Sequence, residues 1–174
     1  MSNVKRSLMS LGVLGAVALF PACNSALDDP DTADVVLEIV TITAQPIEAQ
    51  DDGSGVCTFT VQDWNAQLRN EPKSELATQS PFGDIRLVRI DATYDWGSDG
   101  TIEQSRVLPV AGTVPAGGTQ AVQFTPITFE DLAGREGQSA SMGMLWIGET
   151  YDGYPVTVWT SRMLNVNSCI LAGP

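Results

Sequence analysis

The sequence IRLVRIDATYDW, residues 85–96, alternates apolar and polar side chains more regularly than the rest of the chain. From Val88 to Trp96, every second residue is apolar, and Arg, Asp or Thr occupies the positions between. Successive side chains of a strand point to opposite faces, so this period predicts a β-strand with one face in a core. The sequence GSDG at 97–100 then predicts a turn into a hairpin partner at 101–110.

Shorter segments with the same period lie on both sides of this hairpin, separated by clusters of Gly, Pro, Asn and Asp. These segments are residues 35–44, 56–68, 119–124, 139–147 and 156–166. In the second of them the apolar residues are odd-numbered from Cys57 to Val61 and even-numbered from Trp64 to Leu68. One continuous strand cannot bury both sets on the same side, which predicts a bulge or a change of sheet near Gln62 and Asp63.

The connections between these segments are predicted to be short. Residues 45–55 and 114–118 are rich in turn-forming residues, and 70–83 is a polar excursion long enough for one helical turn. The segment Thr128 to Asp131 resembles a capping box, which predicts a short helical turn that Gly134 ends. We find no internal repeat and no long helical period.

About seven or eight strands with short connections are typical of an antiparallel β-sandwich, and we predict this all-β fold for residues 35–174. Over residues 35–169 the pattern resembles the architecture of immunoglobulin-like and fibronectin-like domains. The cysteine spacing of the immunoglobulin family is absent, since Cys169 lies close to the C-terminus. Any disulfide to Cys57 therefore differs from the bridge of that family.

The first 22 residues are organised like an export signal. Lys5 and Arg6 precede an uncharged, mostly apolar run from Ser7 to Phe20. This run of about 14 residues is shorter than the ~20 that a membrane-spanning helix needs. Ala22, a small residue, and Cys23 then follow.

A cysteine directly after a small residue at the end of a signal resembles the lipobox of bacterial lipoproteins. The resemblance implies that Cys23 carries fatty acyl chains such as palmitate and becomes the mature N-terminus, although Phe20 replaces the usual Leu. The alternative is ordinary secretory cleavage, which needs small residues at −1 and −3, and Phe20 occupies −3. Asn24, rather than aspartate, follows the cysteine, which favours the outer membrane of the bacterial cell envelope.

Residues 24–34 are small and acidic, which predicts a solvated tether between Cys23 and the domain. With Cys23 acylated, Cys57 and Cys169 remain as an even pair in an oxidising compartment, and we predict a disulfide between them. Such a bridge closes a loop of about 110 residues, for which chain entropy gives a stabilisation of up to ~4.7 kcal/mol.

Charge and composition exclude several classes of function. The net charge is −12, and it becomes about −14 when Lys5 and Arg6 leave with the signal, so the chain repels nucleic acid. Histidine is absent, which removes Ser-His-Asp and Cys-His catalysis and His-ligated metal sites. We therefore expect no enzyme and no cofactor.

One loop has a weak resemblance to a calcium site. Asp95, Asp99 and Glu103 stand at positions 1, 5 and 9 of a calcium-loop pattern, with Gly100 at position 6. The residue at position 12 is Arg106, where a bidentate Glu would be needed. A plain hairpin turn explains the same residues.

Aromatic residues and paired carboxylates are the other candidates. Trp96, Tyr151 and Tyr154 are predicted as a ligand-binding patch, because two of them lie in a Gly-containing loop; the alternative is that they belong to the core. The pairs Asp91/Asp95 and Glu149/Asp152 are the candidates for carboxylate catalysis, which requires two convergent carboxyl groups in a cleft.

The sequence thus favours a non-enzymatic envelope lipoprotein, held to the membrane by its lipid, that binds an envelope protein or glycan or has a structural role. The alternatives are a carboxylate-based hydrolase of envelope polysaccharide and a calcium-stabilised adhesion module.

Overall fold

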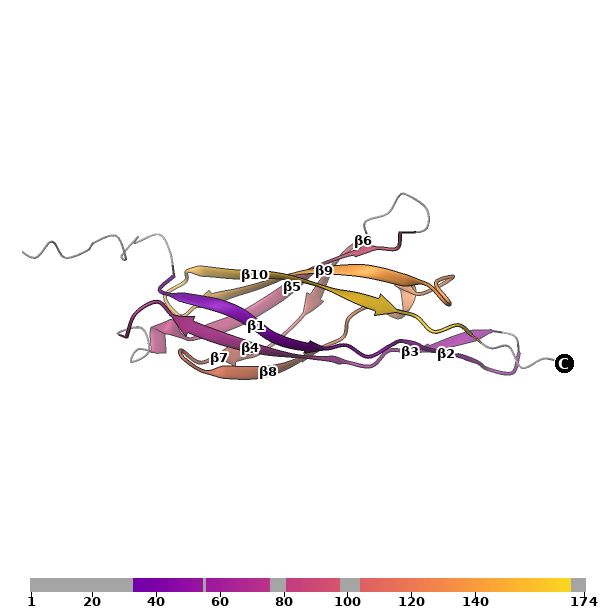
Figure 1. The fold of residues 1–174 in the computed structure, drawn as a ribbon, viewed down its shortest axis with the longest axis horizontal. Coiled ribbons are helices and arrows are strands. Elements are labelled where there is room, and N and C mark those ends of the chain that lie inside the picture. Colours follow the sequence, from indigo (N-terminus) through magenta and orange to yellow (C-terminus); the bar gives the residue numbers. More distant parts are fainter. Residues whose placement is uncertain (1–32, 55, 76–80, 98–103, 170–174) are drawn as a thin grey trace, which may run out of the picture.

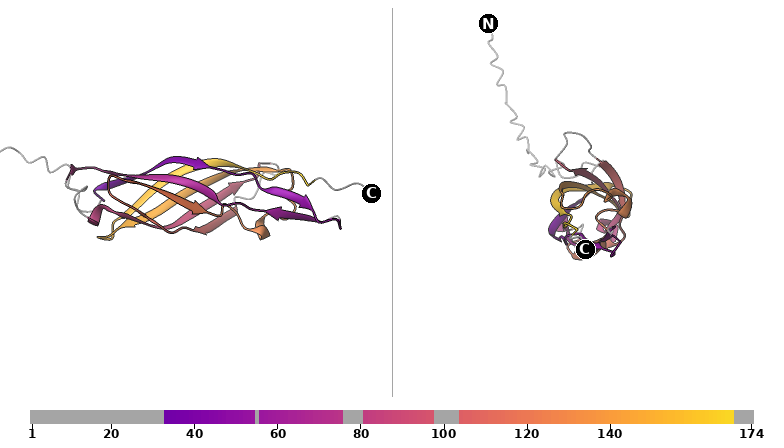
Figure 2. Two further views of the ribbon diagram at one scale, coloured as in Figure 1. Left: turned by 90° about the horizontal axis from the view of Figure 1, so that it is seen from below. Right: turned by 90° about the vertical axis from the view of Figure 1, so that its right-hand side faces the viewer.

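A computed structural model describes residues 33–54, 56–75, 81–97 and 104–169. It shows an elongated, nearly all-β molecule in which two antiparallel sheets face each other (Figures 1 and 2). The small sheet has the order β1 (Val35–Thr43), β4 (Trp64–Pro72), β8 (Thr119–Phe124). The large sheet has the order β10 (Pro155–Asn165), β9 (Ser139–Thr150), β5 (Ile85–Asp95), β6 (Gln104–Pro109), and β7 (Thr113–Val114) pairs with the start of β5. The predicted antiparallel sandwich is confirmed.

A third, two-stranded unit lies at one end of the molecule. This end hairpin consists of β2 (Glu48–Asp51) and β3 (Cys57–Thr60). The described residues therefore contain ten strands rather than seven or eight, because β2 and β7 have no alternating apolar residues to predict them. The prediction of a mere turn at 45–55 is wrong for β2, whereas Asp51 and Asp52 do accept the backbone amides of Gly53 and Ser54 in the tight connection.

The predicted change of sheet near residues 62–63 is confirmed. Strand β3 ends at Thr60 in the end hairpin, and β4 begins at Trp64 in the small sheet. The three residues between them form no strand. Odd-numbered residues can therefore be the apolar ones in β3 and even-numbered residues the inward-pointing ones in β4.

Strand β5 lies in the middle of the large sheet, paired with β9 on one side and β6 on the other. Its pairing with β9 shifts register between Leu87 and Arg89. This bulge interrupts the alternation, so that Leu87 and Ile90 are both buried and Val88 is 39% exposed. The predicted inward position of Val88 is therefore wrong, because one extra residue in a strand reverses the side-chain parity.

The core fills the space between the two sheets. Phe124 of the small sheet packs edge-on against Trp64, with ring centroids 6.1 Å apart, and against Trp146 of the large sheet at 5.2 Å. Tyr94 is fully buried and its hydroxyl donates a hydrogen bond to the carbonyl of Pro126 at 2.5 Å. Burial raises the pKa of Tyr94 strongly, and the nearby Asp131 carboxylate adds to this effect.

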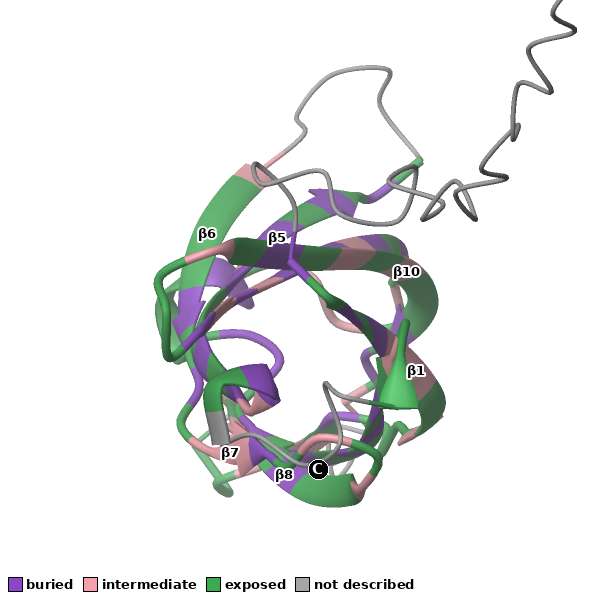
Figure 3. Cartoon of the chain, turned by 90° about the vertical axis from the view of Figure 1, so that its left-hand side faces the viewer, coloured by how far each residue is buried: buried purple, intermediate pink, exposed green. Residues whose placement is uncertain are grey.

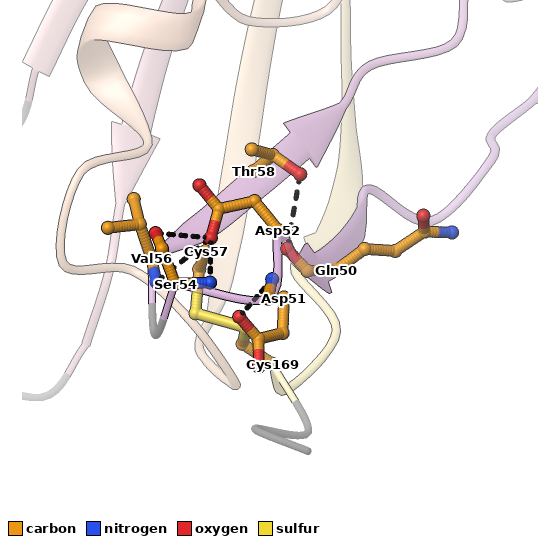
Figure 4. Close-up of a disulfide and its surroundings, with 9 residues drawn as sticks. Gln50, Asp51, Asp52, Ser54, Val56, Cys57, Thr58 and Cys169 are labelled. Carbon is orange, nitrogen blue, oxygen red and sulfur yellow. Dashed lines mark hydrogen bonds between the residues drawn. A yellow bond between two sulfur atoms is a disulfide. The ribbon is translucent and has the colours of Figure 1, made fainter.

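The end hairpin is tied to the C-terminal segment (Figure 4). The amide of Ile47 donates to the carbonyl of Asn165, and the amide of Asn167 donates to the carbonyl of Ile47, each at 2.9 Å. Cys57 and Cys169 form a disulfide with their Cα atoms 6.0 Å apart, as predicted. The bond joins the start of β3 to the chain that leaves β10, at the end of the sandwich opposite to the start of β1 (Figure 1).

Two short 3₁₀ turns, η2 (Pro81–Gly83) and η3 (Phe129–Asp131), are described. The predicted turn at 128–131 is confirmed, but Thr128 makes no side-chain cap and donates its hydroxyl to the Asp131 carboxylate instead. The predicted turn within 70–83 falls partly on residues 76–80, outside the described residues. Within the described part of the chain, no helix has the length and apolar character needed to cross a bilayer.

Candidate binding surface on the large sheet

The outer face of the large sheet, which points away from the small sheet, is the candidate functional surface. Residues directly opposite each other in neighbouring antiparallel strands project to the same side. One row across the sheet therefore runs from Trp159 on β10 through Leu145 and Asp91 to Val107 on β6. A neighbouring row has Thr157, Ile147, Arg89 and Pro109, and the next one has Ser161, Gly143, Thr93 and Ser105.

Trp159 is the most prominent side chain of this outer face. It is 66% exposed, whereas the other three tryptophans of the chain are at least 94% buried. A Cβ atom added at Gly143 would lie 3.7 Å from the indole Nε1 of Trp159 and 2.8 Å from Thr93 Oγ1. Glycine at position 143 therefore leaves the space in which the indole lies close to the sheet.

Several apolar side chains lie on the same face as Trp159. Leu145 and Ile147 of the adjacent strand are half-buried, and Val107 at the far edge of the sheet is 66% exposed. Met163, two positions further along the same face of β10, is also exposed. Packing within the domain does not account for these exposed apolar side chains, since the core lies on the opposite side of the sheet.

Two ion pairs lie on the outer face. Arg89 Nε donates to Asp91 Oδ1 at 2.9 Å, and Arg86 forms an ion pair with Glu149. A shallow depression of about 610 Å³ lies over β5 and β6 next to the first of these pairs. Arg89, Asp91, Thr93, Ser105 and Val107 line it, with Ala92 and Arg106.

The aromatic patch expected from the sequence does not form as one site. Ile85 pairs with Thr150 and Asp95 with Ser141, so β5 separates Trp96 from the β9–β10 turn by its full length. Trp96 is buried, and the guanidinium of Arg135 lies 4.8 Å from its ring centroid. At the other end Tyr151 is 60% exposed, while Tyr154 packs against the core.

The sequence contains a signal for the exposure of Trp159, which the predicted patch of Trp96, Tyr151 and Tyr154 does not include. Val156 and Val158 alternate along β10 with Thr157 and Ser161, and Trp159 shares the phase of the two hydroxyl residues. A tryptophan in the polar phase of an amphipathic strand indicates an exposed aromatic side chain.

The predicted calcium ligands are only partly described. Asp95 Oδ1 accepts a hydrogen bond from the backbone amide of Gly97 at 3.0 Å, as in a simple turn. Asp99 and Glu103 lie outside the described residues, and the described part of the chain has no group of three acidic, Cys or His side chains placed for a metal. Calcium binding at this loop stays a prediction.

The carboxylate pairs have other partners. Asp91 and Asp95 are four residues apart on one strand, a span of about 13 Å, which exceeds the ~5–9.5 Å between the carboxyl groups of a glycosidase. Asp91 pairs with Arg89, and Glu149 with Arg86. Asp152 accepts a hydrogen bond from Thr150 in the β9–β10 turn.

A buried polar cluster around Asp131 lies on the inner side of β6. The Asp131 side chain is 2% exposed, and its carboxylate accepts hydrogen bonds from Arg106, Gln104 and Thr128. The hydrogen bond from Arg106 holds the pKa of Asp131 below its ordinary value, although burial opposes this shift. The cluster joins the edge strand β6 to η3, so we assign it a structural role.

The predicted lipidation site, Cys23, lies outside the described residues with the predicted signal and most of the tether. The two described residues that precede β1 also contact the sandwich. Ala33 is buried, and the carbonyl of Asp34 accepts the amide of Lys73 at 2.8 Å.

Neither a protein-family model nor a characterised protein matches the sequence. Solved structures with partial similarity include the ApaA protein from Bordetella pertussis, at 12% identity and a TM-score of 0.42 over 78% of this chain and 97% of that one. AggA, the major subunit of aggregative adherence fimbriae type I from Escherichia coli, has 10% identity and a TM-score of 0.36 over 80% and 97%. Murine CRIg has 16% identity and a TM-score of 0.28 over 77% and 98%. The function of this chain is therefore inferred from its own residues.

Proposed function

We propose that this chain is a non-enzymatic binding lipoprotein of the bacterial cell envelope. In this proposal acyl chains on Cys23 hold the protein in the membrane, with the outer membrane favoured by Asn24. The sandwich presents the outer face of its large sheet to a partner in the envelope.

The observation that carries the binding role is the exposure of Trp159. Tryptophan has a larger apolar surface than most side chains, and burying that surface is favourable. An exposed tryptophan does not contribute this free energy to folding, but it can contribute it to the binding of a partner. Tryptophan is also the residue most enriched among those that dominate binding energy. Its position above Gly143 and beside Leu145 gives it a defined place on a regular sheet, unlike a side chain on a loose loop.

The position of the surface along the molecule suits a tethered binding protein. The described chain begins at the end of the sandwich where β1 and β10 start, opposite to the disulfide (Figure 1). Trp159 lies five residues into β10, on the side of the sandwich. The extended tether, about 3.3–3.6 Å per residue over roughly ten residues, would leave this side accessible to other envelope components.

The test uses the full-length protein expressed in a bacterial envelope and extracted in detergent. Mass spectrometry is expected to find acyl chains on an N-terminal Cys23, and none in Cys23→Ser. Crosslinking in the intact envelope is expected to capture a partner that Trp159→Ala loses and Tyr151→Ala retains. Tyr151 is a matched control because it is similarly exposed but lies at the β9–β10 turn. An unprocessed leader, or capture that is independent of Trp159, would refute the corresponding half of the proposal.

A further inference from the structure

We infer that the outer face of the large sheet is a glycan-binding surface, which takes a neutral oligosaccharide lying across the strands with one sugar ring stacked on Trp159. This inference rests on the proposed binding role and specifies the chemistry of the partner.

The first step is the exposed indole. The face of an aromatic ring carries partial negative charge and attracts the partly positive C–H groups of a sugar ring. The indole lies beside Gly143 on the sheet, since a Cβ atom at that position would be 3.7 Å from its Nε1, and 66% of Trp159 remains open to solvent. The indole therefore offers a platform whose position is set before the ligand arrives, which lowers the entropic cost of binding.

The second step is the set of polar groups around this platform. The two rows next to that of Trp159 carry short hydroxyl side chains, namely Thr157 in one and Ser161, Thr93 and Ser105 in the other. Hydroxyl groups donate and accept hydrogen bonds, as sugar hydroxyls do. Arg89 and Asp91 add a planar donor and a charged acceptor side by side, and both remain partly exposed.

The third step concerns the length of the outer face and its net charge. Trp159 and Val107 are three strand spacings apart, about 14 Å, which is the length of a short oligosaccharide. The depression beside Arg89 and Asp91 lies along this path. The two ion pairs neutralise most of the charge of this face, whereas the chain as a whole carries −12. A neutral glycan is therefore favoured over an anionic one.

The distribution of apolar side chains favours a sugar over a protein partner. A stable protein interface needs about 800 Å² on each side with a contiguous apolar centre. Here Asp91 stands between Leu145 and Val107, and the neighbouring rows are hydroxylated. A small, amphipathic ligand fits this alternation better than a second copy of the chain or another protein does.

The experiment titrates the full-length lipidated protein with neutral six-unit oligosaccharides of β-linked glucose, β-linked N-acetylglucosamine and α-linked mannose. A detergent without a sugar head group is needed, and polygalacturonate serves as the anionic comparison. Because Trp159 is the one exposed tryptophan, ligand binding is expected to change its fluorescence and to protect it from acrylamide quenching.

Isothermal titration calorimetry, which does not depend on the indole, measures the affinity of the parent and of every variant. At least one neutral oligosaccharide is expected to bind, with a dissociation constant that Trp159→Ala raises by more than about tenfold. Trp159→Tyr should keep most of the affinity, since it keeps an aromatic ring, and Tyr151→Ala should change nothing. Asp91→Asn and Arg89→Gln are expected to weaken binding by several-fold without loss of folding, which circular dichroism checks.

Failure of this inference and failure of the proposed function give different results. If no neutral oligosaccharide shows binding that depends on Trp159, the inference is overturned. If, at the same time, crosslinking still captures a protein partner through Trp159, the proposed binding role stands and its partner is a protein. A dimer that Trp159→Ala dissociates would identify a second copy as the partner, and would equally overturn the glycan assignment.

Discussion

The inner and outer faces of the large sheet are built from the same strands but place their side chains in different surroundings. Trp146 and Trp159 belong to neighbouring strands, and Trp159 pairs with Leu145, the residue before Trp146. Trp146 is fully buried against Phe124, whereas Trp159 is largely exposed among hydroxyls and paired charges. Figure 3 shows buried and exposed residues following one another along the strands. Burial of apolar surface explains the inner face, whereas for the exposed tryptophan of the outer face we propose a role in binding.

The largest expected effect is on the inner face. Trp146→Ala should lower the free energy of unfolding by about 4 kcal/mol, since it removes a large buried side chain and leaves a cavity next to Phe124. Urea denaturation followed by circular dichroism measures this loss. A loss below about 1 kcal/mol would show that the inner face is not the close-packed core described here.

Removal of the disulfide should destabilise the protein and leave the outer face unchanged. The double variant Cys57→Ser/Cys169→Ser is expected to lose about 3 kcal/mol, because the unfolded chain regains the freedom of a loop of over 100 residues. Acrylamide quenching of Trp159 in the folded variant should match that of the parent. Altered quenching would mean that the end hairpin influences the outer face, so that the surroundings of Trp159 are not set by the large sheet alone.

The Asp131 cluster predicts a pH dependence that belongs to the inner side of the sandwich. The folded state lowers the pKa of Asp131, so its ionisation contributes stability at pH values above the unfolded pKa of about 3.9, and this contribution is lost as the pH falls through the lower folded value. Asp131→Asn should cost about 1–2 kcal/mol near neutral pH and should flatten the acid limb of the stability curve. Urea titrations between pH 2.5 and 7 provide the measurement.

The matched control for this prediction is Asp91→Asn on the outer face. Asp91 pairs with Arg89 at a solvent-exposed site, so its loss should change the stability by less than about 0.5 kcal/mol. An acid limb that persists in Asp131→Asn would assign the pH dependence to other carboxyl groups.

The smallest effect on stability is expected from Trp159→Ala. We expect a change of less than about 0.5 kcal/mol, because the side chain is mostly in water in the folded state as well. The variant should lose the long-wavelength part of the tryptophan emission and most of the accessibility to acrylamide. A loss of several kcal/mol would make Trp159 a structural residue and weaken the case for a binding surface.

Much of the fold could be predicted because the evidence for it is local. Alternation identified β5 and its neighbours, and the change of apolar parity after Val61 identified the step from β3 to β4. Cysteine parity pointed to the Cys57–Cys169 bridge that the structure contains. Strand β2 and the position of Val88 were missed, since a short polar strand has no alternating apolar residues and a bulge leaves no mark in composition.

The candidate surface was harder to predict, because exposure depends on residues that are distant in the sequence. The pattern of β10 placed Trp159 in the phase of Thr157 and Ser161, but it could not show which side the small sheet covers. The predicted association of Trp96 with Tyr151 and Tyr154 depended on the register between β5 and β9, which the sequence does not show. The observed register places Trp96 at one end of β5 and the two tyrosines at the other end.

The sequence by itself determined the strand periods, the main turns, the disulfide partners and an acidic, histidine-free composition. Only the tertiary structure decided which aromatic side chains share a surface and which of them face water. The physical reason is that alternation is a property of one strand, whereas burial is a property of the second sheet that packs against it, brought there by residues far away along the chain.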